Sequence, residues 1–526
     1  MLAPRTDDHS RPPRTARAPR TARPPHPARA PRAGGRGLVV LAAALATLGF
    51  AGLGLASAAV AQPLPIRIDT RSSLARQFGY RPGYELNIPS FDPWNRPAIR
   101  SRTPARDVTG TVARLNGDGT WVASSLIRAV QRAYPTFERT VNAGGYVSER
   151  VEFDAAGRAY TLLDIRLRGG GRRNVLLYSL DGCRSWRLVT LPFGGRRVVY
   201  DGHDGGTASL EQYAGWNASE RPPLVAVWRP VSDWPGRRAA RNLLYVLAPS
   251  FRGRRLVLPA PTLVSDKFIG MTYAAGGASF AATSGATSYI VWAEVADPGA
   301  AGTPTFVCAF DRDTATVTAP VPVAQASPVN DDHDTPGIVI DGEGYLHVLT
   351  GAHNAQFLYA HSLASRDVSA WATAVPVLGD GAAQTAGSTT GIARQTYLSL
   401  ACLPDDSLVI VYRQRRAGVD PDFGGASYDA LSLQRRSPDG VWSDAVPLVC
   451  SADRAGYVCY HQKLTVDRRG RLYLSLSYFN PALYPPRQRS ANRFRYRMVL
   501  TSRDGGATWD FASTADFLEG MTPAPD

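Results

Sequence analysis

Length, composition and charge exclude several classes of protein. The chain has 526 residues, 44% of them hydrophobic, which is ample for a large buried core and excludes a wholly disordered chain. Its formal net charge is +15, yet no basic stripe with interleaved aromatic side chains occurs, so nucleic acid is not expected as a partner. The 49 Gly and 40 Pro are scattered, as in proteins built from short strands joined by turns.

Residues 1–61 are expected to be a leader. An Arg- and Pro-rich segment comes first, and an apolar run from Leu38 to about Val60 follows it. This order is typical of a secretory signal cleaved after Ala61, although the apolar run is also long enough to remain as a membrane anchor. With cleavage, we expect a secreted or periplasmic protein without stable membrane association.

The charge of the remaining chain is more modest. Residues 1–61 carry nine Arg and two Asp, which leaves a formal charge of +8 on the rest. A moderate positive charge is expected of a protein that binds an anionic partner. It is equally expected if the proteins of the source organism are generally rich in arginine.

After the leader, a hairpin pattern recurs about every 62 residues. Each copy has a short alternating strand, an acidic or Gly turn and a second alternating strand. Four copies are clear, with the turn acids Asp154, Asp341, Asp405 and Asp467. The same period predicts three further turns near residues 92, 217 and 279, for which Asp92, Asn217 and, about five residues late, Thr283–Gly285 are the candidates.

A second motif keeps nearly the same period. Ser502–Trp509 matches the Asp-box pattern S-x-D-x-G-x-T-W, and Ser179–Trp186 is a close copy. Ser437–Trp442 and Asn116–Trp121 are degenerate copies. The acid and Gly of this motif hold a tight turn and the Trp packs between sheets, so we expect a structural role only.

Seven units of about four strands indicate a propeller rather than a helical solenoid. We predict an all-β chain with a seven-bladed β-propeller of about 62 residues per blade. The propeller is expected over residues 62–515, with a C-terminal tail at 516–526 and a short helix near Ser124–Ala133. Ring closure removes free sheet edges that would otherwise pair with other chains, and we expect a monomer.

The hairpins predict where functional side chains gather. In each blade, residues just before the first strand and just after the second converge at one mouth of the central channel. His333 precedes the first strand of the fifth unit, and His353 follows the second strand. Two imidazoles at a channel mouth suit proton transfer, although two loop histidines that hydrogen-bond their own turns would give the same pattern.

The next two units are expected to place tyrosine, arginine and histidine side chains at the same mouth. Tyr397 precedes the first strand of the sixth unit and Arg413 follows its second strand. In the seventh unit, Tyr457, Tyr460 and His461 precede the first strand. An Arg there suits a carboxylate or a sulfate, whereas a solvated rim charge and packed aromatic rings are the alternatives.

With these motifs in place, the chain resembles BNR-repeat proteins and, more closely, the propeller-type ulvan lyases of polysaccharide lyase families 24 and 25. The resemblance covers most of residues 80–511. It implies that His333, His353, Tyr397, Arg413 and Tyr457 flank a sugar and act in elimination across a uronate. The metal ligands of those families cannot be placed on this sequence, so a structural metal ion stays unassigned.

The resemblance implies a secreted polysaccharide lyase that cleaves a uronate polymer, sulfated and ulvan-like, by β-elimination. His333, Tyr397 and His353 are the expected catalytic residues, with His333 in proton transfer, Tyr397 as its partner and His353 orienting the uronate. Arg413, Tyr457, Tyr460 and His461 are expected to bind substrate. No cofactor is required for such chemistry. The alternatives are a sialidase-like glycoside hydrolase and a glycan-binding propeller without catalysis.

Overall fold

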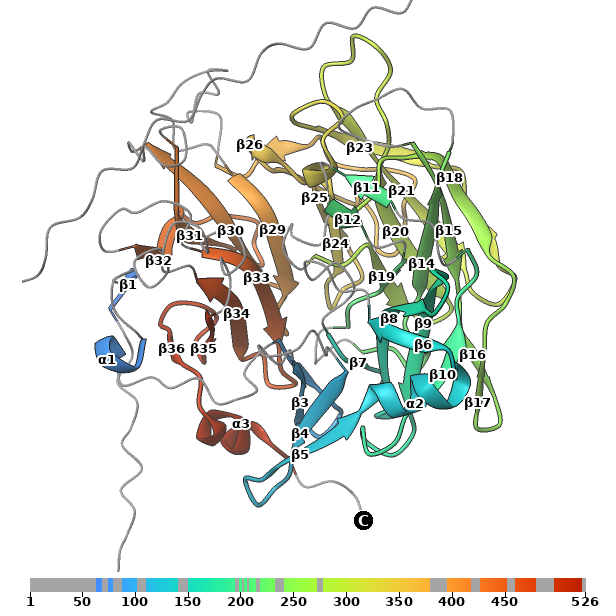
Figure 1. Cartoon of the computed structure of the whole chain (residues 1–526). Helices are drawn as coiled ribbons and strands as arrows, with labels where there is room; N and C mark the ends of the chain where they lie inside the picture. Colours follow the sequence, from blue (N-terminus) through green and yellow to red (C-terminus); the bar gives the residue numbers. More distant parts are fainter. Residues whose placement is uncertain are drawn as a thin grey trace, which may run out of the picture. The chain divides into compact units, whose positions relative to one another are not determined.

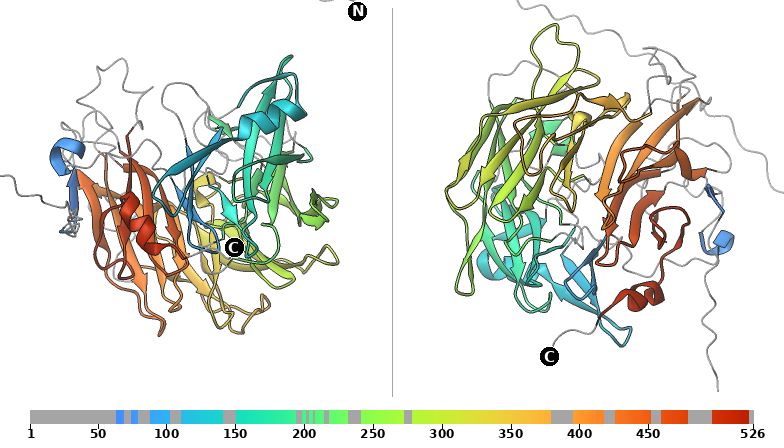
Figure 2. Two further views of the ribbon diagram at one scale, coloured as in Figure 1. Left: turned by 90° about the horizontal axis from the view of Figure 1, so that it is seen from below. Right: turned by 180° about the vertical axis from the view of Figure 1, so that it is seen from behind.

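The predicted hairpins are the inner strand pairs of seven antiparallel sheets, which follow one another around a centre in chain order (Figure 1). The chain is a seven-bladed β-propeller in this computed structural model. The same order of sheets can be followed in the two views of Figure 2. Four strands form each blade, from the innermost strand A to the outermost strand D, as the sequence predicts.

The structure describes residues 63–68, 74–78, 88–101, 110–140, 150–193, 198–200, 203–205, 208–213, 218–231, 241–271, 278–378, 395–417, 426–451, 459–478 and 496–522.

The first four blades each begin with a short inner strand. Their strands are, for blade 1, β2 (Pro89–Phe91), β3 (Pro97–Ser101), β4 (Thr111–Leu115) and β5 (Trp121–Ser125); for blade 2, β7 (Glu152–Phe153), β8 (Ala159–Leu167), β9 (Arg172–Ser179) and β10 (Arg187–Thr190), with β6 (Phe137–Thr140) on β8; for blade 3, β13 (Ala208–Leu210), β14 (Val225–Pro230), β15 (Asn242–Leu247) and β18 (Thr262–Phe268); and for blade 4, β19 (Ala281–Ser284), β20 (Thr287–Ala293), β21 (Thr303–Asp311) and β22 (Thr316–Val317), with β23 (Val321–Ala326) on β21.

The last three blades hold most of the candidate site residues. Their strands are, for blade 5, β24 (Gly337–Ile340), β25 (Leu346–Leu349), β27 (Leu358–His361) and β28 (Val375–Pro376); for blade 6, β29 (Gln395–Cys402), β30 (Leu408–Ala417), β31 (Ala426–Arg436) and β32 (Val446–Ser451), with β26 (His353–Ala355) on β29 and β1 (Ile66–Ile68) parallel to β32; and for blade 7, β33 (Cys459–Val466), β34 (Leu472–Tyr478), β35 (Tyr496–Ser502) and β36 (Asp510–Phe511).

Within the described residues, two small hairpins and four short helical segments lie outside this pattern. They are β11 (Val198–Tyr200) with β12 (His203–Gly205), β16 (Ser250–Arg252) with β17 (Arg255–Val257), and the helices α1 (Leu74–Phe78), α2 (Leu126–Ala133), α3 (Thr514–Gly520) and the 3-10 turn η2 (Asp332–Asp334). Helix α2 confirms the helix predicted at 124–133, and Ser125 caps it by accepting the N–H of Arg128.

The A–B turns lie where the 62-residue period predicts them. The carboxylate of Asp154 accepts the backbone N–H groups of Ala156 and Arg158, which fixes a tight turn, and Asp92 and Asp467 do the same in blades 1 and 7. The turn at 284–287 joins β19 to β20. The turn expected near Asn217 lies partly outside the described residues, although β13 and β14 flank it.

All four Asp boxes occupy the C–D turn of their blades. In the best two, Asp181 accepts hydrogen bonds from Ser185 and Asp504 accepts them from Thr508, each through both the backbone and the hydroxyl. Trp186 and Trp509 are buried, as the structural role predicts. The same turn in blade 5 holds an unpredicted relative of the motif, in which Asp367 accepts from Ser369.

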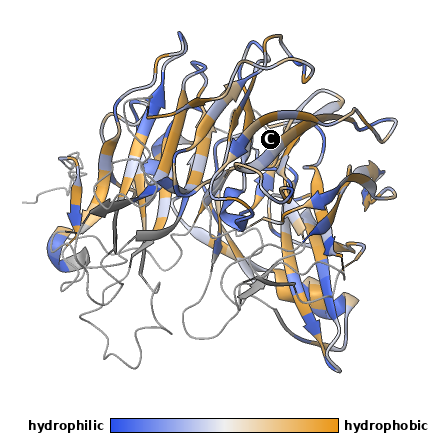
Figure 3. Cartoon of the chain, turned by 90° about the horizontal axis from the view of Figure 1, so that it is seen from above, coloured by the Kyte–Doolittle hydropathy of each residue, from blue (hydrophilic) through white to orange (hydrophobic). Residues whose placement is uncertain are grey.

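The core lies between neighbouring sheets rather than at one centre. Residues alternate between the two faces of each strand, and every blade therefore packs both faces against its neighbours. Figure 3 shows hydrophobic residues recurring along the strands. The clusters join blade to blade; one of them contains Trp228 and Phe268 of blade 3 with Trp292 and Phe310 of blade 4.

Asn95 closes the ring between the first and last blades. Its side-chain amide donates to Asp467 and to the backbone oxygen of Gly520, and its oxygen accepts the N–H of Arg468. Phe517 of α3 stacks on Tyr473 of blade 7 with ring centroids 5.1 Å apart. The boundary predicted at residue 515 therefore falls inside a helix that packs on the propeller.

None of the helices within the described residues is both long and apolar enough to cross a membrane.

Candidate active site

Histidines from two different loops meet where blades 5 and 6 adjoin. His333 belongs to η2, which precedes β24, and His353 begins β26, which follows β25 (Figure 1). The N–H of His353 donates to the backbone oxygen of Ser327, and His353 pairs with Thr396 on β29. The imidazole rings stack, with centroids 4.1 Å apart and planes at 26°. The structure thus brings together the pair that the hairpin spacing predicts.

One carboxylate, that of Asp331, binds both imidazoles. Its Oδ1 lies 2.5 Å from Nδ1 of His333, and its Oδ2 lies 2.9 Å from Nδ1 of His353. Asp331 also caps η2 by accepting the N–H of His333. Asp332 adds a second carboxylate 3.1 Å from Nδ1 of His333. The orientation of each ring is therefore fixed by its Nδ1 atom, which leaves each Nε2 for other partners.

The charges and hydrogen bonds of this cluster indicate which of its groups carry a hydrogen. Burial favours a protonated Asp331, but the hydrogen bonds from His333 and His353 outweigh it and hold the pKa of this carboxyl well below its usual range. An ionised carboxylate only accepts hydrogen bonds, so both Nδ1 atoms carry hydrogen. Burial alone would lower the pKa of His333, but its hydrogen bonds to Asp331 and Asp332 raise that pKa to about 11. His333 is an imidazolium at neutral pH.

Tyr397 lies on the other side of His333. Its hydroxyl is 3.3 Å from Nε2 of His333, and the two ring centroids are 5.3 Å apart. Tyr397 has a φ of +62°, and the pairing of β29 with β30 shifts register between Thr396 and Ser399. Such a bulge changes the direction in which a side chain points. The left-handed backbone conformation costs conformational free energy in a residue that has a Cβ atom. The Gln462 amide, which donates to the backbone oxygen of Tyr397, helps to hold it.

Arg413 lies behind Tyr397 rather than at the open mouth. Its guanidinium carbon is 4.2 Å from the centre of the Tyr397 ring, and the residue is only 1% exposed. The sequence predicts direct substrate binding by Arg413. Burial under an aromatic ring instead favours an effect exerted through Tyr397, whose ring it orients and whose surroundings it makes more positive.

Two further residues of the site, Gly351 and Asp334, are not among the site residues predicted from the sequence. A Cβ atom on Gly351 would lie 2.3 Å from the backbone carbon of Asp334 and 2.5 Å from the oxygen of His333, so only glycine lets η2 approach this closely. The Asp334 side chain is fully buried, and burial raises its pKa well above the usual range. Asp334 is therefore a buried carboxyl directly next to His333 in the chain.

The structure does not describe the side chains of the three candidates from blade 7. Tyr457 lies outside the described residues. Tyr460 and His461 belong to β33, which is the inner strand of blade 7, but their side chains lie outside the described part of the chain. Their predicted role in substrate binding stays a prediction.

The same cluster has the residue types of a metal site. Among the described residues, Asp331, His333 and His353 form the one group whose ligand atoms lie close enough to hold an ion, within 4.8 Å of one another. Both Nδ1 atoms carry hydrogen in the arrangement above, so an ion held between Asp331 and these two atoms would have to displace both hydrogens. The hydrogen-bonded form fits proton transfer better than metal binding.

A family model covers this region. Residues 304–519 match the model described as a BNR repeat-containing family member. This stretch contains blades 5 to 7 and every described residue of the candidate site, and it confirms the resemblance to BNR-repeat proteins predicted from the Asp boxes. A comparison with curated protein sequences found no significant match.

Solved structures with similar folds include lyases and sialidases. The polysaccharide lyase Uly1 is 14% identical with a TM-score of 0.31, and the match covers 46% of this chain and 56% of the lyase. A PL25 ulvan lyase bound to -[GlcA(1-4)Rha3S]- is 12% identical with a TM-score of 0.25, covering 44% of this chain and 69% of that one. The Trypanosoma rangeli sialidase with sialic acid is 12% identical with a TM-score of 0.36, covering 82% and 60%. Similarity this distant says nothing about activity, so the function must be argued from the site itself.

Proposed function

We propose that this chain is a polysaccharide lyase, which cleaves an anionic polymer at a 4-linked uronate by β-elimination. The observation that carries the proposal is the single ionised carboxylate of Asp331 on both His333 and His353, with Tyr397 at the far side of His333. This arrangement supplies a base, a cation and a hydroxyl donor at one channel mouth. A sulfated, ulvan-like polymer is the substrate class that we favour, in agreement with the cationic body.

The base in this proposal is His353. Asp331 accepts its Nδ1–H, so Nε2 is the atom that takes a proton, and the side chain is 30% exposed. His353 takes the proton from C5 of the uronate, and the C5–H electron pair forms the C4=C5 double bond. This assignment differs from the sequence prediction, in which His353 orients the uronate, because His333 is already protonated and cannot be the base.

Tyr397 is the acid. The imidazolium Nε2–H of His333 donates to the phenolic oxygen, so the phenolic hydrogen points away from His333. As the C4–O4 bond breaks, its electron pair stays on O4, and O4 takes the hydrogen of Tyr397. His333 then returns a proton to the phenolate. The positive charges of His333 and Arg413 flank the Tyr397 ring and stabilise the negative charge that develops there.

The carboxylates near the mouth argue against a sialidase-like hydrolase. Such an enzyme needs a carboxylate pair facing the sugar. Asp331 is occupied by the two histidines, and Asp334 is fully buried. Glu294 accepts from the Ser265 hydroxyl and the Trp292 indole. A glycan-binding propeller would need none of the charge arrangement around Asp331.

Incubation with ulvan, glucuronan, alginate and heparin-like polymers tests the proposal. Elimination leaves a C4=C5 double bond conjugated with the carboxylate, and we expect the ultraviolet absorbance of that group to rise with at least one polymer. Saturated oligosaccharides would indicate a hydrolase instead, and retention without cleavage would indicate a binding module. The substrate polymer would be met outside the cell, in line with the predicted leader.

A further inference from the structure

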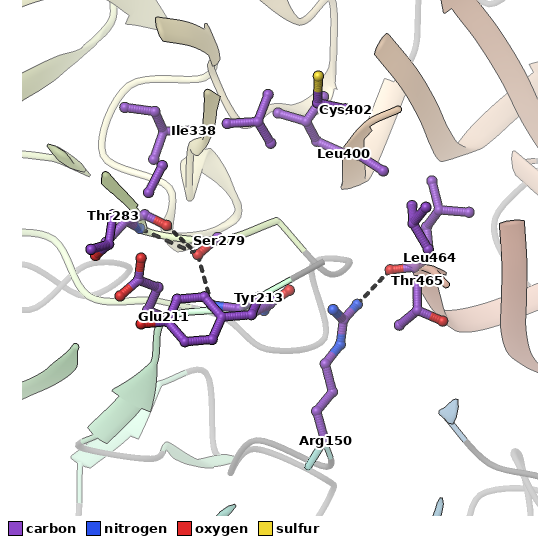
Figure 4. A pocket seen from close by; sticks show the side chains of 16 residues that line it. Arg150, Glu211, Tyr213, Ser279, Thr283, Ile338, Leu400, Cys402, Leu464 and Thr465 are labelled. Atoms are coloured by element: carbon purple, nitrogen blue, oxygen red, sulfur yellow. Dashed lines mark hydrogen bonds between the residues drawn. The ribbon is translucent and has the colours of Figure 1, made fainter. Parts of the chain in front are cut away.

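A second polar site lies between the inner strands of the blades. A cavity of about 50 Å³ is lined by the inner strands of blades 3 to 7 and by Arg150 just ahead of β7 (Figure 4). None of the lining residues belongs to the cluster of Asp331, His333, His353 and Tyr397. The cavity is therefore separate from the candidate active site.

One wall of this cavity consists of oxygen acceptors. Glu211 is 1% exposed, and its Oε2 accepts the N–H of Leu224 and lies 4.0 Å from Nη1 of Arg312. Its Oε1 has no hydrogen-bond partner among the described residues, and the same holds for Oε1 of Gln212. Figure 4 shows Glu211 next to Tyr213 and Thr283 on this wall, while Arg150 reaches across to the backbone oxygen of Leu464.

A second carboxylate stands beside this wall. Glu152 of blade 2 is 2% exposed, and its Oε2 accepts the N–H of Tyr213, while its Oε1 has no partner within the described part of the chain. Burial raises the pKa of Glu152 to about 7 and also raises the pKa of Glu211, and the charge of Glu211 adds to the rise at Glu152. Arg150 and Arg312 supply positive charge near Glu152 and Glu211 respectively, so it is one oxygen of each carboxylate, rather than the whole group, that is left without a partner among the described residues.

Carboxylate and amide oxygens without donors are the ligands that a hard cation prefers. Leaving such acceptors buried without a partner costs about 1–3 kcal/mol each. Calcium takes six to eight oxygen ligands, including carboxylates, amide oxygens and waters. A cavity of this volume holds an ion with a few waters, since one water needs roughly 10–15 Å³.

We propose that this cavity is a calcium site, in which Glu211 and Gln212 bind the ion and Glu152 adds negative charge beside it. The ion would tie blade 2 to blade 3 inside the ring of blades. Arg150 and Arg312 lie close by and reduce the net negative charge, so we expect a dissociation constant of about 10⁻⁴ to 10⁻³ M, as in extracellular calcium modules.

Calcium titration of the full chain after treatment with EGTA tests this proposal. We expect calcium to raise the thermal unfolding midpoint, with a matching binding isotherm in calorimetry. Glu211→Gln should abolish both effects, and this variant should fold because Gln resembles the protonated Glu. His353→Ala should retain both, since the catalytic cluster is not the site. Absence of any calcium effect on the wild type would overturn the proposal, and so would an unchanged effect in Glu211→Gln or its loss in His353→Ala.

A second variant decides the matter if Glu211→Gln does not fold. Gln212→Glu adds a charged ligand to the same wall, and we expect it to tighten calcium binding about tenfold. An unchanged dissociation constant would contradict direct binding by residue 212. These readouts do not depend on catalysis, so they stand or fall separately from the lyase proposal.

Discussion

His333 and His353 stack with ring centroids 4.1 Å apart, and both bind the carboxylate of Asp331. Two imidazoles in contact would repel each other if both were charged, and the shared carboxylate compensates one positive charge. His333 has a second carboxylate close by, because Asp332 lies 3.1 Å from its Nδ1, and this favours His333 as the ring that carries the charge. This asymmetry underlies the assignment of His333 as the cation and of His353 as the base.

Asp331→Asn tests the shared carboxylate. An Asn side chain has one acceptor oxygen, so it cannot accept from both Nδ1–H groups, and one imidazole would lose its orientation. We expect kcat to fall about 10²-fold or more in the ultraviolet assay, with a smaller change in KM. Asp313→Asn is the control, because Asp313 lies on the exposed C–D turn of blade 4. Equal rates in Asp331→Asn and wild type would exclude the proposed role.

Tyr397→Phe separates the hydroxyl from the ring. Phe keeps the surface that Arg413 packs on but has no proton to give, so we expect kcat to fall about 10²–10⁴-fold with KM little changed. Arg413→Lys should reduce kcat in the wild type yet have little further effect in Tyr397→Phe, because Arg413 is proposed to act through Tyr397. Additive losses with a raised KM would mean that Arg413 contacts the substrate directly.

The charge on His333 predicts how stability varies with pH. Its folded pKa, about 11, lies above the unfolded value, so its contribution is complete below about pH 6.5 and is lost as pH rises toward the folded value. Relative to His333→Gln, the free energy of unfolding of the wild type should fall between about pH 6.5 and pH 9, by at most about 1.4 kcal/mol per pH unit. Denaturant unfolding of both proteins measures this difference, and a difference that stays constant with pH would show that His333 is not charged in the fold.

Gly351→Ala tests the close approach of η2. The added methyl would clash with the backbone of His333 and Asp334, so we expect a loss of about 1–3 kcal/mol of stability and a displaced His333. Gly171→Ala is the matched control, because a Cβ atom at Gly171 meets nothing within 4 Å. Urea unfolding and the ultraviolet assay together distinguish the two variants. Similar stability and activity in both would show that η2 moves freely.

The propeller could be predicted from the sequence because its determinants are local. Alternating strands and acidic turns are encoded within about 15 residues, and Asp92, Asp154 and Asp467 each fix a turn through their own neighbours. The start of helix α3 is also encoded locally, since Ser513 and Asp516 form a capping box. The sequence prediction did not make use of this motif.

The site could be predicted only in part. Blade topology places His333 and His353 at one mouth, and this needs nothing beyond strand order. The bond from Asp331 to His353 depends on how two loops approach in space, which no spacing reveals. The burial of Arg413 likewise depends on the bulge that turns Tyr397 over it, so a residue expected at the surface lies beneath an aromatic ring.

Mass analysis of the products tests the central claim most directly. If the polymer that this chain cleaves yields oligosaccharides whose new non-reducing end is a uronate one water lighter than the saturated sugar, the bond was broken by elimination. We predict this product from the wild type and its absence from His353→Ala and Tyr397→Phe. Saturated ends that incorporate oxygen from labelled water would contradict the account, because they would show hydrolysis at the same mouth.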